Sequence, residues 1–486
     1  MRQASLSRWL LAVVCAVLAL QNLRASPAAD EAYWPYWRGP AADGMAIGDA
    51  PLHWSDTQNV VWKTDIPGLG HSSPVVWGDR IFLTTAIKTG AGAAATETAQ
   101  APGAQPGPAA GPPPAAPSAP PHAVAQGAGQ GPGHGPEQSP GQGRGGFMGS
   151  SGPLVEHKFD VICLDRKTGK ILWQRTAKIA TPHEGTHNVY GSFASNSPVT
   201  DGKFVYASFG SRGMYCYDMD GKLIWQKDFG VKLRMRMGFG EGMAPVLAGT
   251  KLILVFDHED ESFITVLDKT TGKEIWRATR DGRTNWAAPL VVPFGGRTQV
   301  VVSATAKVVS YDLENGKVVW ECSGLGANTI PQPVRQDDMV FVMSGYQNPK
   351  LMAIKLGREG DLTGTDAIVW TETKGTSYSA SPVIFDNKLY VLTDTGMVSC
   401  FNARTGVPYY AQVRLPKSYS FKSSPVGVNG KLYLASENDD VIVLKMGEKF
   451  EVLATNTMAD QVFIATPAIT GGEIFLRSKT TLFCIR

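Results

Sequence analysis

Acidic side chains are the first residues in this chain whose type and spacing could do chemistry. The run Asp257-His-Glu-Asp-Glu261 places four carboxylates within five residues. Oxygen ligands at this density suit Ca²⁺, which makes Asp257, Glu259 and Asp260 candidate metal ligands. The run lacks the glycine-spaced loop of an EF-hand, and a solvated acidic loop is the simpler interpretation. We therefore predict no metal site and keep these three residues as the alternative.

Cysteines are the second group of residues that could do chemistry. Five of the six cysteines follow residue 28, and no Cys-x-x-Cys or Cys-x-x-Cys-His spacing occurs. A metal knuckle, a thioredoxin-like site and covalent c-type haem therefore lack their ligands. Cys163, Cys216, Cys400 and Cys484 each stand two residues before an Asp or its equivalent, so they occupy one repeated strand position. We expect them to be buried as small hydrophobic residues.

A repeat of about 45 residues must position these side chains. A Pro followed by an apolar residue recurs eight times, and from Pro198 onward the spacings are 47, 44, 44, 49, 43 and 42 residues. Periods of 40 to 50 residues indicate propeller blades or solenoid units. Each unit holds short alternating runs bounded by Gly, Asn and Asp, which are typical of strands joined by hairpins. The eight prolines are Pro74, Pro198, Pro245, Pro289, Pro333, Pro382, Pro425 and Pro467.

A turn before the last strand of a unit gives the clearest signature. It reads Asp165-Arg-Lys-Thr-Gly169-Lys-Ile-Leu-Trp173 in one unit and Asp268-Lys-Thr-Thr-Gly272-Lys-Glu-Ile-Trp276 in another. The Asp can bond turn amides, and the Gly accepts the positive φ of a tight hairpin. The Trp then lies on an outer strand, where we expect it to pack between neighbouring blades with its N–H free for a partner.

This unit resembles the repeat of the quinoprotein, or pyrroloquinoline quinone (PQQ), propellers. It is also similar to non-enzymatic PQQ-like propellers, including the outer-membrane β-barrel assembly lipoprotein. The opening Trp34-Pro-Tyr-Trp37-Arg-Gly-Pro-x-x-x-Gly44 looks like the start of exported bacterial members. The resemblance covers roughly residues 34–88 and 157–486, and it implies the fold more than the function, because repeat residues build the scaffold.

Eight units predict an all-β fold, an eight-bladed β-propeller with four-stranded antiparallel blades. The last unit supplies only three strands before Arg486, and Asn59-Val-Val-Trp62-Lys63 looks like an outer strand without an inner partner. Pairing of the two ends would close the ring and hide its sheet edges. Seven blades are the alternative, because the fifth and seventh units lack a clean turn signature.

The loops that enter the first strand of each blade should ring one mouth of the central channel. We predict a ligand ring there of mixed charge with aromatic residues, suited to a polar ligand or a peptide. Its alternative role is to bind water only. The predicted members are His71, His187, Asn188, Asn196, Arg234, Arg236, Glu241, Asn285, Trp286, Gln332, Tyr378 and Lys422.

Two segments lie outside the repeats. Residues 1–28 combine Arg2 and Arg8 with a 12-residue apolar run and later small residues, which predicts a signal peptide and a periplasmic or secreted protein. Its removal takes away three arginines and no acid, so the formal charge of +3 becomes zero. A neutral protein has no general attraction for nucleic acid. Residues 89–152 are rich in Ala, Gly, Pro and Gln, which predicts a disordered insertion between residues 29–88 and 153–486.

We predict that the protein acts as a binding or scaffold module, and we favour this function over that of an enzyme. A binding module would present its loops to a protein, peptide or glycan in the cell envelope, as a monomer with no integral membrane segment and no cofactor. The alternative is a quinoprotein dehydrogenase, which would need PQQ, Ca²⁺ and a general-base Asp. The alcohol dehydrogenases of that type carry adjacent cysteines over the quinone, and this chain has no Cys-Cys pair.

Overall fold

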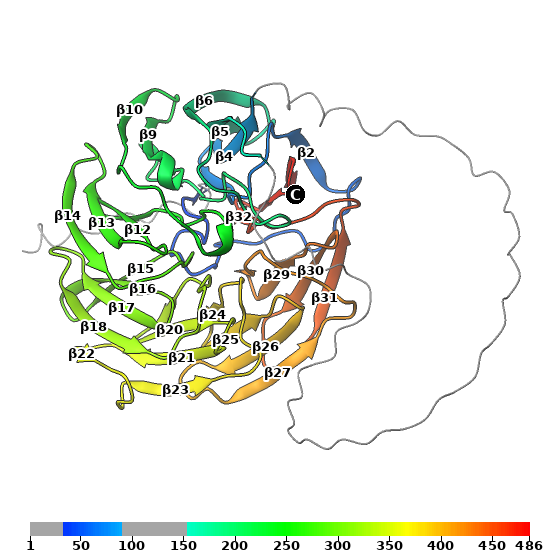
Figure 1. Ribbon diagram of the computed structural model, residues 1–486. Coiled ribbons are helices and arrows are strands. Elements are labelled where there is room, and N and C mark those ends of the chain that lie inside the picture. Colours follow the sequence, from blue (N-terminus) through cyan, green and yellow to red (C-terminus); the bar gives the residue numbers. More distant parts are fainter. Residues whose placement is uncertain (1–32, 90–152) are drawn as a thin grey trace, which may run out of the picture.

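The computed structural model describes residues 33–89 and 153–486 as a ring of eight antiparallel sheets (Figure 1). The eight-bladed prediction is confirmed, and the seven-bladed alternative is wrong. Residues 1–28, the predicted signal peptide, and all but Thr89 of the predicted insertion up to Gly152 lie outside the described residues.

The blades follow one another in chain order, each with its inner strand first. Blade 1 holds β3 (Val75–Trp77), β4 (Arg80–Lys88), β5 (His157–Asp165) and β6 (Ile171–Ala180), and blade 2 holds β7 (Val199–Thr200), β8 (Phe204–Ser208), β9 (Met214–Asp218) and β10 (Leu223–Lys227). Blade 3 holds β11 (Val246–Ala248), β12 (Lys251–Phe256), β13 (Ser262–Asp268) and β14 (Glu274–Arg280), and blade 4 holds β15 (Leu290–Phe294), β16 (Arg297–Ser303), β17 (Lys307–Asp312) and β18 (Val318–Ser323).

The second half of the ring has the same plan. Blade 5 holds β19 (Val334–Gln336), β20 (Met339–Ser344), β21 (Lys350–Lys355) and β23 (Ile368–Glu372), and blade 6 holds β24 (Val383–Phe385), β25 (Lys388–Leu392), β26 (Met397–Asn402) and β27 (Pro408–Arg414). Blade 7 holds β28 (Val426–Val428), β29 (Lys431–Ala435), β30 (Asp440–Lys445) and β31 (Val452–Thr457), and blade 8 holds β32 (Ala468–Thr470), β33 (Glu473–Arg477), β34 (Thr481–Ile485) and β2 (Val60–Asp65). Two short strands extend these sheets: β1 (Tyr33–Trp34) pairs with β3, and β22 (Gly360–Asp361) pairs with β18.

The ends of the chain close the ring as predicted. Strand β2 pairs antiparallel with β34, from Val60 opposite Ile485 to Asp65 opposite Thr481. The last blade thus takes its outer strand from the N-terminal part of the chain. This pairing closes the ring and covers the edge of β34 that would otherwise be free.

Five outer-strand Trp side chains dock under the signature turn of the next blade, whereas Trp320 bonds Gln299 of its own blade. The indole N–H of Trp62 donates to the carbonyl of Arg166 at 2.9 Å, and Trp173 does the same to Met219. The ring lies against the turn glycine: a Cβ on Gly169 would come within 2.5 Å of Trp62. Glycine is therefore required there both by its positive φ and by the close approach of the indole. The other docked pairs are Trp225 with Lys269, Trp276 with Leu313 and Trp370 with Ala403.

The Ser and Thr residues before the repeat prolines form a second inter-blade belt. The hydroxyl of Ser424 accepts the backbone N–H of Ser381 at 2.9 Å, and the hydroxyl of Thr466 accepts that of Ser424 at 3.1 Å. The belt continues through Ser73 and Ser197. Blades 3 and 4 carry Ala244 and Ala288 at this position. There Asn196 bonds the carbonyl of Met243, and the amide of Trp286 bonds that of Thr329.

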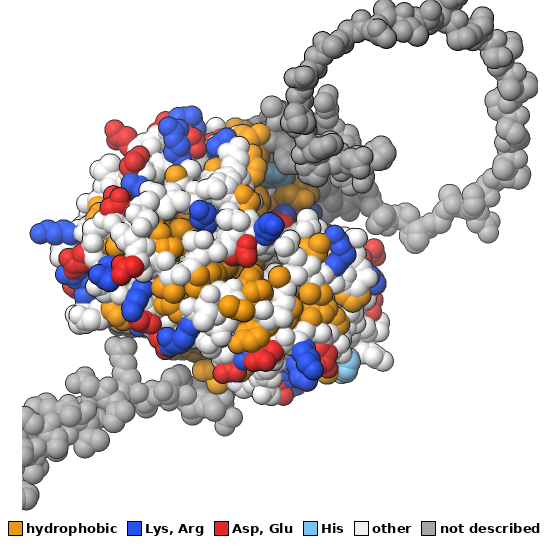
Figure 2. Space-filling model, turned by 90° about the horizontal axis from the view of Figure 1, so that it is seen from below, with side chains coloured by type: hydrophobic (Ala, Val, Ile, Leu, Met, Phe, Trp, Pro, Cys, Tyr) orange, Lys and Arg blue, Asp and Glu red, His pale blue; other side chains and the backbone are white. Residues whose placement is uncertain are grey.

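The two ends of the blades have different roles. The signature turns and the first hairpins lie at one end, here called the turn face. The connections between blades and the turns between second and third strands lie at the other end, here called the loop face. The loop face therefore carries the irregular segments, and the turn face carries the repeated ones. Figure 2 shows the side of the ring between these two faces, where hydrophobic, basic and acidic side chains are interspersed.

An N-terminal segment, residues 33–46, fills the middle of the ring (dark blue in Figure 1). The hydroxyl of Tyr36 bonds Gln332 of blade 5 at 3.2 Å, and Gly44 and Ala46 pair with Gly427 of blade 7. The Arg38 guanidinium is fully buried and donates to the carbonyls of Pro382 at 2.5 Å and Pro425 at 3.0 Å. The inner strands therefore surround protein atoms at this level.

Removal of a belt hydroxyl should destabilise the ring. Ser424→Ala leaves the buried N–H of Ser381 without its acceptor, so we expect a loss of about 1–3 kcal/mol in the free energy of unfolding. Urea denaturation measures this loss. Ser323→Ala, on the exposed part of β18, is the control and should unfold like the parent protein. Equal stability of S424A and S323A would contradict the role of the belt.

Deletion of residues 89–152 should leave the fold intact. Strands β4 and β5 are paired along their whole length, up to Lys88 opposite His157, so residues 153–156 are enough for a short connection. We expect the melting temperature of the deletion variant to stay within a few degrees of the parent. A large drop would show that the deleted residues contribute to the fold.

Candidate functional site on the loop face

The predicted ligand ring lies on the loop face, but its twelve residues do not surround one cavity. Gln332 is buried and bonded to Tyr36 inside the ring. His71, His187 and Lys422 meet around Tyr190 at the mouth of the channel. Asn196, Glu241 and Asn285 line a pocket between blades 2 and 3. The remaining members do not line this pocket: Asn188, Arg234, Arg236, Trp286 and Tyr378.

A loop from blade 2, residues 181–198, covers the mouth of the channel. The carbonyl of Tyr190 accepts a hydrogen bond from Nδ1 of His71 in blade 1 at 2.9 Å. The Lys422 ammonium of blade 7 lies 4.5 Å from the centre of the Tyr190 ring, and the His187 ring stacks on Tyr190 with 4.8 Å between the ring centres. Burial, reinforced by Arg477, lowers the pKa of His71 to about 3, so this imidazole is neutral at neutral pH.

The charges around the mouth are matched within the protein. Lys422 lies 2.8 Å from Asp394 and 3.7 Å from Glu437. Asp394 also accepts the backbone N–H groups of Tyr378 and Ser379. These bonds connect the loops of blades 6 and 7. They engage the Lys422 ammonium, which was expected to contact a ligand.

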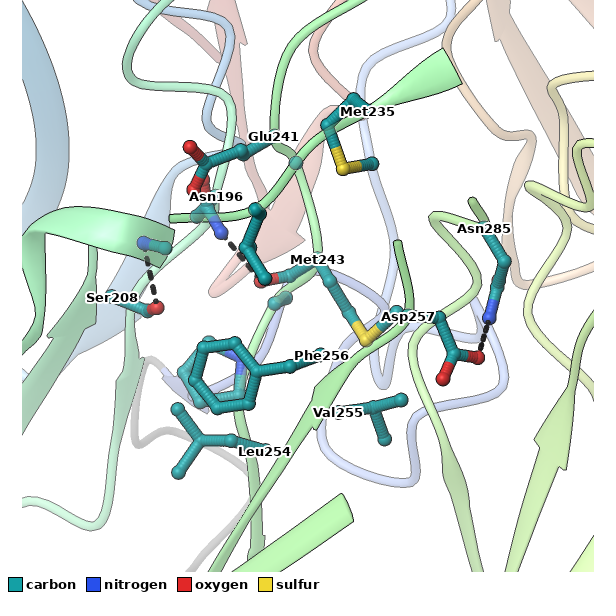
Figure 3. A pocket seen from close by; sticks show the side chains of 15 residues that line it. Asn196, Ser208, Met235, Glu241, Met243, Leu254, Val255, Phe256, Asp257 and Asn285 are labelled. Atoms are coloured by element: carbon teal, nitrogen blue, oxygen red, sulfur yellow. Dashed lines mark hydrogen bonds between the residues drawn. The ribbon is translucent and has the colours of Figure 1, made fainter. Parts of the chain in front are cut away.

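A pocket lies between blades 2 and 3 on this face (Figure 3). In this view Glu241 and Met235 lie at one end, Leu254 and Phe256 at the other, and Met243 between them. The pocket's cavity volume is about 20 Å³, which is enough for about one ordered water molecule.

An ion pair holds the polar end of this pocket. Glu241 accepts from Arg212 at 2.7 Å and also from the N–H and hydroxyl of Ser211. Both charged side chains are buried, with exposed fractions of 7% for Arg212 and 6% for Glu241. Breaking such a pair by removing one partner is costly, so Glu241 is held in place as a structural carboxylate.

Glu184 is a residue of this site that sequence reasoning missed. It lines a second, adjoining cavity together with Phe193, Arg212 and Glu241. Both of its carboxylate oxygens accept the N–H of Met235, at 3.2 and 3.1 Å. Burial, with a further contribution from Glu241, raises the pKa of Glu184 to about 7. It lies in an irregular loop outside the repeat period, so no pattern in the sequence pointed to it.

The acidic run is divided among separate partners. Asp257 is buried and bound to Arg280 at 2.7 Å and to Asn285. Glu259 pairs with Arg283, and Asp260 with Arg234. Within residues 33–89 and 153–486, no three His, Cys, Asp or Glu side chains come together to hold a metal ion.

The cysteines lie where the repeat placed them. All five described cysteines are free and buried. Cys163, Cys216 and Cys484 stand opposite Trp173, Trp225 and Trp62 on the neighbouring strands. Burial raises the pKa of the Cys163 thiol to about 12, which leaves it an inert packing group. The expectation of small hydrophobic packing residues is confirmed.

The described residues do not fit the quinone and calcium of the alternative prediction. Arg38 and its neighbours fill the centre of the ring, and the pocket between blades 2 and 3 has room for little more than a water molecule.

Comparison with known proteins supports the PQQ-like resemblance. Residues 157–361 match the family described as outer membrane protein assembly factor BamB. The chain is 23% identical over 352 residues to the tetrathionate hydrolase of Acidithiobacillus ferrooxidans, covering 65% of this chain and 66% of that protein. The match thus spans just under two thirds of the curated relative.

The fold is similar to that of a solved dehydrogenase structure. A europium-containing methanol dehydrogenase has a TM-score of 0.57 at 10% identity, covering 92% of this chain and 89% of that one. BamB from Moraxella catarrhalis has a TM-score of 0.49 at 13% identity, covering 67% of this chain and 91% of that one.

None of the helices in the described part of the chain is long and apolar enough to cross a membrane.

Glu184 should make stability depend on pH. Its folded pKa of about 7 lies above its ordinary value, so its stabilising contribution is present at acidic pH and is lost as the pH rises through 7. The side chain of Glu184→Gln cannot ionise. The melting temperature of this variant minus that of the parent should therefore be larger at pH 8.5 than at pH 5.5. Thermal melts at both values test this, and an equal difference at the two would contradict the raised pKa.

Proposed function

We propose that this chain, which belongs to the PQQ-like β-propeller repeat family, is an exported binding module that holds a polypeptide partner on its loop face. The observation that carries the proposal is the closed centre. The Arg38 side chain lies inside the ring and bonds inner-strand carbonyls. The loop of residues 181–198 lies over the mouth of the channel, where Tyr190 contacts His71 and Lys422. What remains for recognition is a surface of loops around a small pocket, which suits a polypeptide better than an enclosed cofactor.

Apolar side chains exposed on the loop face support this function. They come from connections into different blades and from one strand turn of blade 5, so they border the mouth from several sides. Exposed aromatic and Met side chains of this kind are typical anchors in protein interfaces. The exposed fractions are 40% for Leu69, 47% for Val189, 49% for Met237 and 40% for Tyr346.

The family comparison is consistent with the same role. The matching family is described as an assembly factor of outer membrane proteins, and the matched residues 157–361 include both cavities between blades 2 and 3. We extend to this chain only the idea of a partner protein in the cell envelope. The curated relative is named as a hydrolase and the larger structural match as a dehydrogenase, so an enzymatic test belongs beside the binding test.

A peptide selection tests the binding function. Peptides selected from a random display library on the purified protein should bind it, and Val189→Asp or Met237→Asp should weaken that binding about tenfold, because each places a charge at an exposed anchor. Val407→Asp is the matched control: Val407 is 62% exposed but follows the signature turn of blade 6 on the turn face. Isothermal titration measures the dissociation constants.

Two results would overturn the proposal. One is that V407D alone weakens binding, because the partner would then sit on the turn face. The other comes from titration with PQQ and Ca²⁺: stoichiometric binding together with dye-linked oxidation of an alcohol or sugar would establish the dehydrogenase instead. We expect no quinone binding at concentrations of tens of micromolar.

A further inference from the structure

The outer strand of blade 4, β18, is covered by a segment of the same chain. The connection between β21 and β23, residues 356–367, runs back across blade 4, and its strand β22 pairs parallel with β18. The N–H of Leu362 donates to the carbonyl of Glu321 at 2.8 Å. The N–H of Ser323 donates to the hydroxyl of Thr363 at 3.0 Å. The outer edge of a blade in this protein can therefore take an added strand.

The added strand also covers an apolar residue of that edge. Val319 is the extra residue of a β-bulge at the start of β18, and it is only 7% exposed, in the same buried cluster as Leu362. In five other blades the residue at this bulge is much more exposed, and no further strand pairs with their outer strands within the described residues. The exposed fractions there are 47% for Val61, 49% for Leu172, 39% for Ile224, 46% for Ile275 and 44% for Val369.

Strand β6 of blade 1 offers the longest free edge among the outer strands of the described blades. It has ten residues, Ile171–Ala180, and lies on the outer rim of the ring (Figure 1). Besides Leu172, it exposes Ile171 by 38% and Ile179 by 52%. Long apolar edge strands of this kind are templates for pairing with another chain.

The backbone and the charge of this edge are open to a partner. Gln174 occupies in β6 the position of Glu321 in β18, one residue after the Trp, so its carbonyl points away from β5. In the described part of the chain that carbonyl accepts only from the exposed side chain of Arg175, at 3.2 Å. Neither Arg175 nor Lys178 forms an ion pair there, and β6 contains no acidic residue. The edge is therefore basic as well as apolar.

We propose that the outer edge of β6 binds an extended segment of a partner polypeptide, which adds to blade 1 as a parallel strand. The segment carries an aliphatic residue, which covers Leu172, and acidic residues, which pair with Arg175 and Lys178. Residues 359–366, Glu-Gly-Asp-Leu-Thr-Gly-Thr-Asp, have this chemistry within the chain itself. The edge lies on the rim of the ring and not on the loop face, so the inference goes beyond the proposed function and does not depend on it.

A peptide with the sequence of residues 359–366, capped at both ends and labelled with fluorescein, is the probe. Fluorescence anisotropy with the full chain measures its dissociation constant. Two control peptides each change one feature. N-methylation of the leucine removes the N–H that Leu362 donates in blade 4, and replacement of the leucine by aspartate removes the aliphatic side chain. We expect each change to weaken binding about tenfold, because strand addition depends on main-chain hydrogen bonds and on pockets for side chains.

A variant of the protein locates the bound peptide on β6. Leu172→Asp should weaken binding of the probe about tenfold, because it places a carboxylate where the leucine of an acidic peptide packs. Ile47→Asp is the matched control and should bind the probe like the parent. Ile47 is 69% exposed and follows Ala46, which pairs with Gly427 of blade 7, away from the outer strands.

Four results would overturn the inference. One is equal binding of the probe and its N-methyl form by the parent protein, which decides the question even if L172D does not fold. Another is unchanged binding by L172D, and a third is no binding by the parent at millimolar concentration. The fourth is a concentration-dependent dimer that L172D abolishes, without binding of the probe, because the edge would then pair with a second copy of this chain. Peptides selected on the loop face depend on Val189 and Met237, so these results leave the proposed function to its own test.

Discussion

The donation of a tryptophan indole N–H to the turn of the next blade is the interaction on which the ring depends. It occurs at 2.9 Å for Trp62, Trp173, Trp225, Trp276 and Trp370. Each contact fixes the angle between two blades, because the indole fits only against a glycine. Where the pattern fails, Trp320 bonds Gln299 of its own blade, and β22 covers the outer edge instead.

The different roles of the turn face and the loop face indicate where a partner could bind. The signature turns on the turn face are occupied by docking, and the hydroxyl belt together with Arg38 fixes the inner strands. The connections on the loop face take no part in this repeated docking. The loop of residues 181–198, which carries Glu184 and Tyr190, lies there, as expected for loops carried by a rigid scaffold.

Much of the fold could be predicted from the sequence because it repeats. The prolines, the Asp-x-x-Thr-Gly turn and the following Trp recur at fixed spacing, which specified eight blades, the inter-blade packing of Trp and the closure by β2. The filled centre could not be predicted, because Arg38 reaches Pro382 and Pro425 over more than three hundred residues of sequence. Glu184 was missed for a related reason: its burial depends on the meeting of two irregular loops, and its residue type alone carries no such information.

The central claim is that the loop face, and no cofactor at the centre of the ring, is where this protein binds its partner. Amide hydrogen exchange of the protein with and without a saturating selected peptide tests it most directly. The account predicts slower exchange in residues 181–198 and 228–245, with no change in the signature turns such as Asp165–Gly169. Protection confined to the signature turns, or to the segment around Arg38, would contradict it.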